Sequence, residues 1–123
     1  MVQEFHKNIL STGEIAVMLF GGEYSHSVLK KAKKGDFRVQ DDFGGSVEKI
    51  IPSLEIIELA EKTVKSLKTM PLYARVDIIF DNGSNPVISE LELIEPELWF
   101  RFKEESAYKL AEIVKDFLNK LNC

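Results

Sequence analysis

Cysteine is almost missing from this sequence, since the single one, Cys123, is the last of 123 residues. One thiol can form neither a disulfide framework within the chain nor the paired cysteines of a structural zinc site. Apolar runs are also short, and none approaches the roughly 20 residues of a membrane-spanning helix. The first residues, MVQEFHKN, do not follow the signal-peptide pattern. These absences favour a cytoplasmic protein without a membrane partner.

Positive charge is scarce as well. Lysine and arginine number 16 against 20 acidic residues, and the net charge of −4 argues against a nucleic-acid partner. The densest basic patch, formed by Lys30, Lys31, Lys33 and Lys34, is typical of a solvated loop. The rest of the composition is ordinary, because 45% hydrophobic and 29% charged residues are typical of a globular protein. We therefore expect a single domain over residues 1–123.

The first third of the chain predicts strands. Residues 2–5 form a short strand-like piece, and residues 8–13 have the small and polar side chains of a turn. Residues 15–20, IAVMLF, are apolar on both faces, which predicts a central strand covered on both sides. The Gly21-Gly22 pair then predicts a hairpin whose second strand covers residues 23–30.

Two amphipathic helices are predicted further along. The first begins after Ser53, its expected N-cap, and ends before Pro71. The second runs from about residue 105 to residue 121 and has one wide apolar stripe. With a further hairpin between them, this order predicts an α+β fold: an antiparallel sheet with two helices packed on one face.

That further hairpin, residues 73–94, alternates charged and apolar side chains. Arg75 and Asp77 share one face of its first strand. On the second strand, the register predicts Val87, Ser89, Leu91 and Leu93 on one face, and Ile88, Glu90, Glu92 and Ile94 on the other. If the loop covers residues 82–85, Asp81 lies opposite Pro86, Asp77 opposite Glu90 and Arg75 opposite Glu92.

This register brings like charges together. Two carboxylates directly across a strand pair repel each other, and a shift by one residue would expose the apolar set. A positive group is therefore expected beside Asp77 and Glu90, either the Arg75 side chain or a bound cation. The alternative is that these residues form only the solvated face of a hairpin.

Four stretches in this order resemble the ATP-grasp ligases: VQEF, GEYSHSVLKKAKKGDFRVQDDFGG, YARVDI and ELELIEPEL. The resemblance is to the branch of the glutathione synthetases and ribosomal-protein glutamate ligases, and it extends from Val2 to about Lys115. It implies that the chain corresponds to the C-terminal half of an ATP-grasp domain. Such domains hold ATP between two α+β halves.

The resemblance implies a nucleotide site near the start of the chain. Gln3, Glu4 and Phe5 match the hinge strand that presents backbone groups to adenine. Glu14 is similar to the acidic residue near the ribose. Ala16 stands where relatives often have an arginine.

Basic and amide side chains are implied to contact the phosphates. Lys30 and Lys31 resemble the basic pair that reaches the phosphates or the acyl-phosphate. In the segment GDFRVQ, Arg38 is similar to the arginine that steadies the transferred phosphoryl group, and Gln40 replaces an asparagine. Arg75 is similar to a residue that steadies the acyl-phosphate, and its alternative role is to pair with Glu92. The glycine turn at residues 44–46 would lie beside the substrate.

The resemblance also implies a metal site. The family uses an aspartate on one strand and an E-x-N pair on the next, which here correspond to Asp77, Glu90 and Glu92. Glu92 replaces the asparagine and adds a negative charge. Carboxylate oxygens suit Mg²⁺, and Mn²⁺ is the alternative ion.

No counterpart of the first ATP-grasp half is found in the sequence. We therefore expect the ATP- and Mg²⁺-binding half of an ATP-dependent carboxylate–amine ligase, inactive alone. The expected partner is a second copy of the chain or a separate subunit that supplies the other half. The alternative is a non-catalytic binding or assembly module that retains the scaffold.

Overall fold

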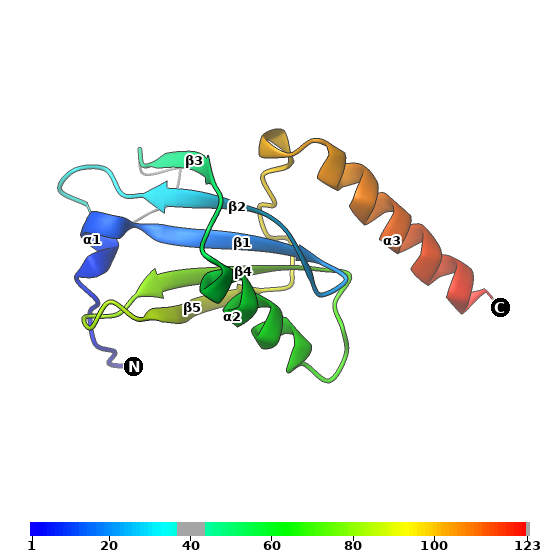
Figure 1. The fold of residues 1–123 in the computed structure, drawn as a ribbon, viewed down its shortest axis with the longest axis horizontal. Coiled ribbons are helices and arrows are strands. Elements are labelled where there is room, and N and C mark those ends of the chain that lie inside the picture. Colours follow the sequence, from blue (N-terminus) through cyan, green and yellow to red (C-terminus); the bar gives the residue numbers. More distant parts are fainter. Residues whose placement is uncertain (37–43, 123) are drawn as a thin grey trace.

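The computed structural model describes residues 1–36 and 44–122. Five strands form one antiparallel sheet in the order β3-β2-β1-β4-β5 (Figure 1). The strands are β1 (Glu14–Phe20), β2 (Glu23–Lys31), β3 (Ser46–Ile50), β4 (Tyr73–Phe80) and β5 (Pro86–Glu92). The helices are α1 (Asn8–Thr12), α2 (Leu54–Lys65), the one-turn 3₁₀ helix η2 (Phe100–Phe102) and α3 (Glu105–Leu121). The predicted α+β class is confirmed, and β1 lies at the centre of the sheet.

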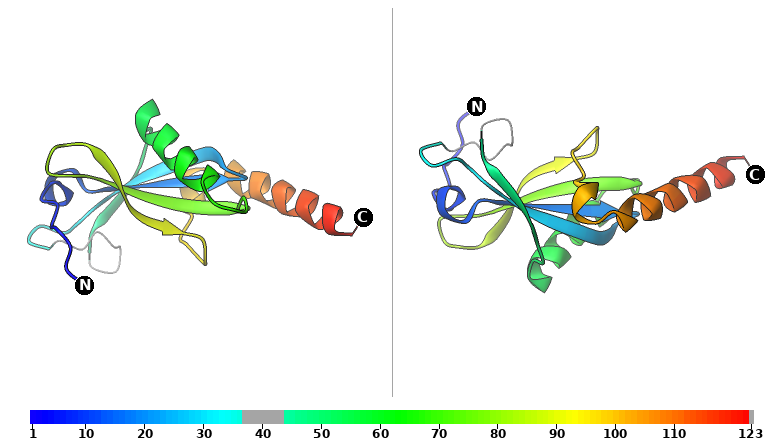
Figure 2. Two further views of the ribbon diagram at one scale, coloured as in Figure 1. Left: turned by 90° about the horizontal axis from the view of Figure 1, so that it is seen from below. Right: turned by 90° about the horizontal axis from the view of Figure 1, so that it is seen from above.

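Alternate residues of β1 contribute to two separate cores. Ile15, Val17 and Leu19 point to one face, where they pack against the buried residues of α2, which are Ile56, Ala60 and Val64. Ala16 and Met18 point to the other face, where the connector between β5 and η2 covers them with Trp99. Figure 2 shows α2 on one side of the sheet and this connector on the other. The sheet is therefore covered on both faces, as the apolar run at residues 15–20 predicts.

Only α2 meets the expectation of helices packed on one face. Helix α3 follows η2 on the opposite side and extends beyond the end of the sheet (Figures 1 and 2). Ser106 is its one buried residue. The physical reason is that the aromatic connector already fills the second face, so α3 has no sheet surface left to cover. Among the described residues, no helix is long and apolar enough to cross a membrane.

The N-terminal segment differs from its prediction. Residues 2–5 form no strand, because no strand in the described part of the chain pairs with them. The expected turn at residues 8–13 contains the five-residue helix α1, and Thr12 Oγ1 donates a hydrogen bond to Asn8 O at 2.6 Å. Gly13 ends this helix with φ of 78°, and a Cβ atom there would lie 2.3 Å from Lys30 O. Only glycine fits this contact.

Strand β3 was missing from the predicted elements. Among the described strands it pairs with β2 alone, at the edge of the sheet, and three of its five residues are exposed. A short edge strand of this kind carries little apolar periodicity, which explains why the sequence pattern does not indicate it.

The hairpin of β4 and β5 contains a bulge. Asp77 pairs with Glu90 and Arg75 with Glu92, as predicted. Nearer the turn, however, Phe80 pairs with Pro86 and Ile78 with Ile88, so the predicted pairing of Asp81 with Pro86 is wrong. The extra residue is Ser89, and the bulge also reverses the predicted faces of Val87 and Ile88. Ile88 shares its face with the buried Ile78 because the two are direct partners.

Candidate functional site

Six charged side chains meet on the face of the sheet opposite α2. Strand β1 begins with Glu14, β2 carries Lys30, β4 carries Arg75 and Asp77, and β5 carries Glu90 and Glu92. We call these six residues the charge cluster. They meet because the strands are neighbours in register: Glu14 pairs with Lys30, Ala16 with Asp77, and Asp77 with Glu90. The cluster therefore contains all three predicted metal ligands and three of the other predicted site residues.

Asp77 is the buried centre of the cluster, with 1% of its surface exposed. Arg75 donates to both of its carboxylate oxygens, from Nε to Oδ1 and from Nη2 to Oδ2, each at 2.9 Å. Lys30 Nζ lies 3.3 Å from Oδ2. Charge-assisted hydrogen bonds of this kind offset the cost of removing a carboxylate from water.

Arg75 is the positive group that the sequence pattern requires. Besides its bonds to Asp77, it donates from Nη2 to Glu92 Oε1 at 2.6 Å and from Nη1 to Glu97 O at 3.4 Å. Burial acts to lower the pKa of Arg75, but the hydrogen bonds and charge of Asp77 outweigh it, so the pKa is raised. The guanidinium therefore stays charged and bridges two of the predicted metal ligands.

Lys30 forms the second ion pair of the cluster. Its Nζ lies 2.5 Å from Glu14 Oε1, and the Lys30 residue is 5% exposed. The interpretation of this lysine as part of a solvated loop is wrong, because its side chain points from β2 onto the covered face of the sheet. Ser89 Oγ lies 2.8 Å from Glu14 Oε2 and 3.1 Å from Asp77 O, so the bulged residue joins the two acids.

The cluster has an excess of negative charge. It contains four carboxylates and two cations, and one ligand atom from each of Asp77, Glu90 and Glu92 lies within 4.8 Å of the others. Burial and the neighbouring carboxylates of Glu92 and Asp77 raise the pKa of Glu90. Each carboxylate oxygen has two lone pairs, so the bonds from Arg75 leave acceptor capacity on Asp77. The donor set and the charge both fit a hard divalent cation.

Trp99 covers the two cations of the cluster. The centroid of its ring lies 5.7 Å from Lys30 Nζ and 5.3 Å from Arg75 Cζ. The structure buries Trp99, and its contact with the cations was not predicted. Ser89 was also missed. The alternating pattern of β5 gives no signal for a bulge, and spacing along the chain cannot show that residue 99 returns over residue 30.

The predicted adenine-binding segment lies outside the charge cluster. Gln3, Glu4 and Phe5 are exposed, and together with His6, Ile9 and Ile79 they line a shallow hollow. The side chain of Asn82, in the turn before β5, holds this segment by donating to Glu4 Oε1 at 3.0 Å. Ile79 lies two residues beyond Asp77 on the same strand, so the hollow adjoins the cluster without sharing its residues.

The other predicted site residues are Lys31, Arg38 and Gln40. Lys31 is exposed at the end of β2 and takes no part in the cluster. Arg38 and Gln40 lie outside the described residues.

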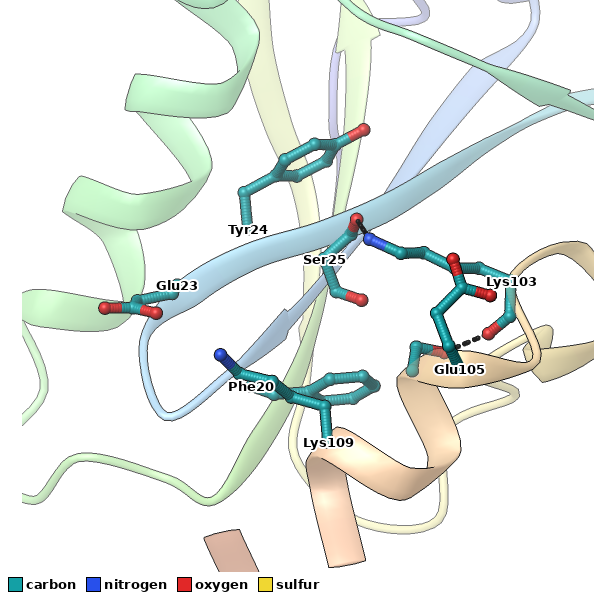
Figure 3. A pocket seen from close by; sticks show the side chains of 8 residues that line it. Phe20, Glu23, Tyr24, Ser25, Lys103, Glu105 and Lys109 are labelled. Carbon is teal, nitrogen blue, oxygen red and sulfur yellow. Dashed lines mark hydrogen bonds between the residues drawn. The ribbon is translucent and has the colours of Figure 1, made fainter. Parts of the chain in front are cut away.

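A second hollow opens at the opposite end of β1 and β2, beside the start of α3 (Figure 3). It is lined by Phe20, Glu23, Tyr24, Ser25, Lys103, Glu105, Ser106 and Lys109. Lys103 Nζ donates to Ser25 O at 2.9 Å and thereby ties η2 to β2. None of the predicted site residues that the structure describes lines this hollow.

Comparisons with known proteins relate the fold to ligases. No protein-family profile matches the chain, and no curated protein sequence matches it. Among solved structures, the D-cycloserine synthetase DcsG has a TM-score of 0.70 and 24% identity, covering 94% of this chain and 41% of its own. The D-alanine–D-alanine ligase from Bacillus anthracis, complexed with ATP, has a TM-score of 0.55 and 23% identity, covering 84% and 36%.

Both of these solved structures are ATP-grasp enzymes. The present chain therefore has the fold of part of an ATP-grasp enzyme, and it spans less than half the length of either one.

Proposed function

We propose that this chain is the ATP- and Mg²⁺-binding half of an ATP-dependent carboxylate–amine ligase. The observation that supports it most is the convergence of Asp77, Glu90 and Glu92 beside the buried cations Lys30 and Arg75. These residues lie on a sheet whose fold resembles those of the two ligases. Carboxylates suited to a divalent cation next to buried cations suited to phosphate are the two requirements of a Mg·ATP site.

The reaction would proceed in two steps. A carboxylate oxygen of the substrate attacks the γ-phosphorus of ATP, the bond to ADP breaks, and an acyl-phosphate forms. An amine then attacks the acyl carbon, phosphate leaves, and an amide results with loss of one proton. Both steps concentrate negative charge on phosphate oxygens, which buried cations stabilise because they are already fixed in place.

The residues of the charge cluster would contact the metal ion, the phosphates and the ribose. Asp77, Glu90 and Glu92 would hold Mg²⁺ or Mn²⁺, and the ion would neutralise negative charge on the phosphates. Lys30 and Arg75 would contact phosphate or acyl-phosphate oxygens. Glu14 would accept from the ribose, which requires it to exchange its contact with Lys30.

The segments around the cluster would complete the nucleotide site. Gln3, Glu4 and Phe5 would contact adenine, Lys31 and Gln40 would contact the nucleotide, and Arg38 would steady the transferred phosphoryl group.

A non-catalytic binding or assembly module is the second candidate. It is favoured by the internal neutralisation of the cluster, in which both oxygens of Asp77 already accept from Arg75. A protein that retained the scaffold for assembly would keep such pairs because they stabilise the sheet. The two candidates differ in whether these pairs open for a ligand.

Calorimetric titration with Mg²⁺ and a non-hydrolysable ATP analogue tests the proposal. We expect binding by the parent chain and a loss of more than about tenfold in affinity for Asp77→Asn and Glu90→Gln, since each removes an anionic ligand. Glu55→Gln is the matched control, because Glu55 is an exposed carboxylate in the first turn of α2. Circular dichroism checks that each variant is folded.

The outcomes separate the two candidates. No binding of the analogue by the folded parent would favour the assembly module. With ATP itself, we expect little ADP release from the isolated chain, because one wall of the cleft belongs to the other half of the domain and water is not excluded. Clear ligation by the isolated chain would contradict the expectation that it needs a partner.

A further inference from the structure

Trp99 contacts both cations of the charge cluster from one ring. It is the single tryptophan of the chain and is 5% exposed. Its ring centroid lies 5.3 Å from Arg75 Cζ and 5.7 Å from Lys30 Nζ, both within the range of a cation–π interaction. Indole is the best of the aromatic rings for this contact, and burial strengthens it because water does not compete for the cations.

The backbone of Trp99 is strained in order to place this ring. Its φ of 45° and ψ of 47° are left-handed, a conformation that bulky side chains rarely adopt. Three hydrogen bonds hold it there. Trp99 N donates to Glu97 Oε1 at 2.9 Å, Phe102 N donates to Trp99 O at 3.0 Å, and Leu98 O lies 2.7 Å from His26 Nε2. Strain that is held by several neighbours points to a function for the strained residue.

The two cations contact carboxylates and the ring of Trp99, and Arg75 also donates to Glu97 O at 3.4 Å. Their carboxylate partners, Glu14, Asp77 and Glu92, are the same groups that the proposed nucleotide and metal contacts would require. A ligand that takes over these carboxylates would exchange the ion pairs, which would leave Lys30 in contact with the ring, and Arg75 in contact with the ring and Glu97 O. The ring of Trp99 has no part in that exchange. It can keep both cations on the sheet face while their carboxylate partners change.

We propose that Trp99 is a positioning residue that holds Lys30 and Arg75 side by side for a phosphate-bearing anion. The inference deepens the proposed function and rests on it for the identity of the anion. Trp99 acts on the cations alone, so its removal weakens anion binding and leaves the carboxylate ligands of the divalent cation in place.

Proton NMR tests the placement of the ring without any ligand. The Cε protons of Lys30 and the Cδ protons of Arg75 should resonate upfield of their usual positions because they lie over the indole. Trp99→Met should abolish the shift and Trp99→Phe should retain part of it. Ordinary chemical shifts in the parent chain would overturn the inference, and this measurement does not depend on a variant that must fold.

Titrations then test the role of the ring. For the non-hydrolysable ATP analogue with Mg²⁺, and separately for pyrophosphate, we expect Trp99→Met to bind about tenfold more weakly than the parent. Trp99→Phe should remain within about threefold, because it keeps an aromatic face. Mg²⁺ alone should bind all three proteins alike. The matched control is Phe100→Leu, since Phe100 stacks on Phe20 at 6.0 Å between centroids, whereas Lys30 and Arg75 lie over the ring of Trp99.

Each outcome has one meaning. Equal losses for Mg²⁺ and for the anions, or equal anion affinity in Trp99→Met and the parent, would overturn the positioning role and leave the proposed function standing. A parent that binds pyrophosphate but not the nucleotide would contradict the proposed function, while a loss of pyrophosphate affinity in Trp99→Met would still support the positioning role. A parent that binds neither anion would overturn both.

Discussion

Buried charge is the main feature at the scale of single residues. Asp77, Arg75 and Lys30 are each less than a tenth exposed, and each depends on the others for its electrostatic balance. Removing one partner of such a buried pair costs about 3–5 kcal/mol, because an uncompensated charge remains. A ligand that displaces one of these three groups must therefore supply a new charge partner for the others.

His26 is a buried titratable residue outside the cluster. Its Nε2 lies 2.7 Å from Leu98 O, so the neutral ring donates there, and its Nδ1 lies 2.9 Å from Ser25 Oγ. Burial lowers the pKa of His26, and the positive charges of Lys103 and Lys49 act in the same direction. The imidazole is thereby kept neutral where it supports the connector that carries Trp99.

The lowered pKa of His26 predicts that the stability of the fold depends on pH. An unfolded histidine takes up its proton near pH 6.5, and the folded His26 does so only at a lower pH. The free energy of unfolding should therefore fall as the pH drops below about 6.5, and the contribution of His26 should be fully lost once the folded pKa is passed. Urea unfolding between about pH 7.5 and 5 measures this fall in the free energy of unfolding.

A substitution isolates the contribution of His26. In His26→Gln, which retains a donor for Leu98 O, the slope of stability against pH should be smaller. The control is His6→Gln, because His6 is the other histidine and lies in the segment before α1. An unchanged slope in His26→Gln would contradict the prediction.

The bulge of β5 has its consequences at the scale of the secondary-structure element. Ser89 is the one unpaired residue between the Asp77–Glu90 and Ile78–Ile88 partners. On the turn side of the bulge Ile88 lies beside Ile78, and on the other side Glu90 and Glu92 lie beside Asp77 and Arg75. The bulge thus lets one short strand place Ile88, which is 36% exposed, beside the buried Ile78, and Glu90 and Glu92 in the charge cluster. Strict alternation from residue 86 would not permit both.

Deletion of Ser89 tests this account of the strand. It should leave Ile88 opposite Ile78 and Glu90 opposite Asp77, so the fold and the charge cluster should persist with a flatter strand. We expect a modest loss of stability, because the contacts of Ser89 with Glu14 and Asp77 disappear. Nuclear Overhauser contacts between β4 and β5 show the pairing, and urea unfolding gives the stability.

Deletion of Ile88 is the matched comparison. It also removes the bulge and keeps Glu90 opposite Asp77, but it places Ser89 beside Ile78 on the apolar face. The loss of stability should exceed that of the Ser89 deletion by about 1 kcal/mol or more, since apolar contact area is lost. Equal stability of the two deletion variants would contradict the proposal that the bulge places Ile88 on the same face as Ile78.

Helix α3 is the conspicuous feature of the whole molecule. It extends past the sheet, and its apolar residues Phe117, Leu118 and Leu121 are 44%, 50% and 64% exposed. Exposed apolar residues that follow one helical stripe are typical of an interface. This stripe favours association with another chain.

We predict that the chain forms a homodimer through α3. Sedimentation velocity should show a dimer whose fraction increases with concentration, and Leu118→Glu should shift it to monomer by placing a charge in the apolar stripe. Asn119→Glu is the control, because residue 119 lies on the polar face of the same turn. A monomer at high concentration would contradict the homodimer and would favour a separate subunit as the partner.

The sequence alone was sufficient for much of the fold. The alternation of residues 73–80, the apolar run at 15–20 and the helical spacing in α2 and α3 are local patterns, and local patterns predict the elements and the face of each side chain. The pairing of Asp77 with Glu90 was predicted by counting from a turn closed by Asp81 and Pro86. The turn is closed by Phe80 and Pro86 instead, and the bulge at Ser89 offsets this difference of one residue. The meeting of these carboxylates on one face was therefore expected from the sequence, whereas their role as metal ligands is implied by the family resemblance and stays a prediction.

What only the tertiary structure decided concerns groups that are distant in the sequence. The sequence required a positive group beside Asp77, but Lys30 and Trp99 meet Arg75 only because β2, β4 and the connector converge on one face. Packing also decides three other features, which are the bulge at Ser89, the edge strand β3 and the projecting α3. Each depends on which surfaces of the sheet are covered by α2 and by the connector. Periodicity describes a residue relative to its own strand, whereas these contacts arise from packing between elements.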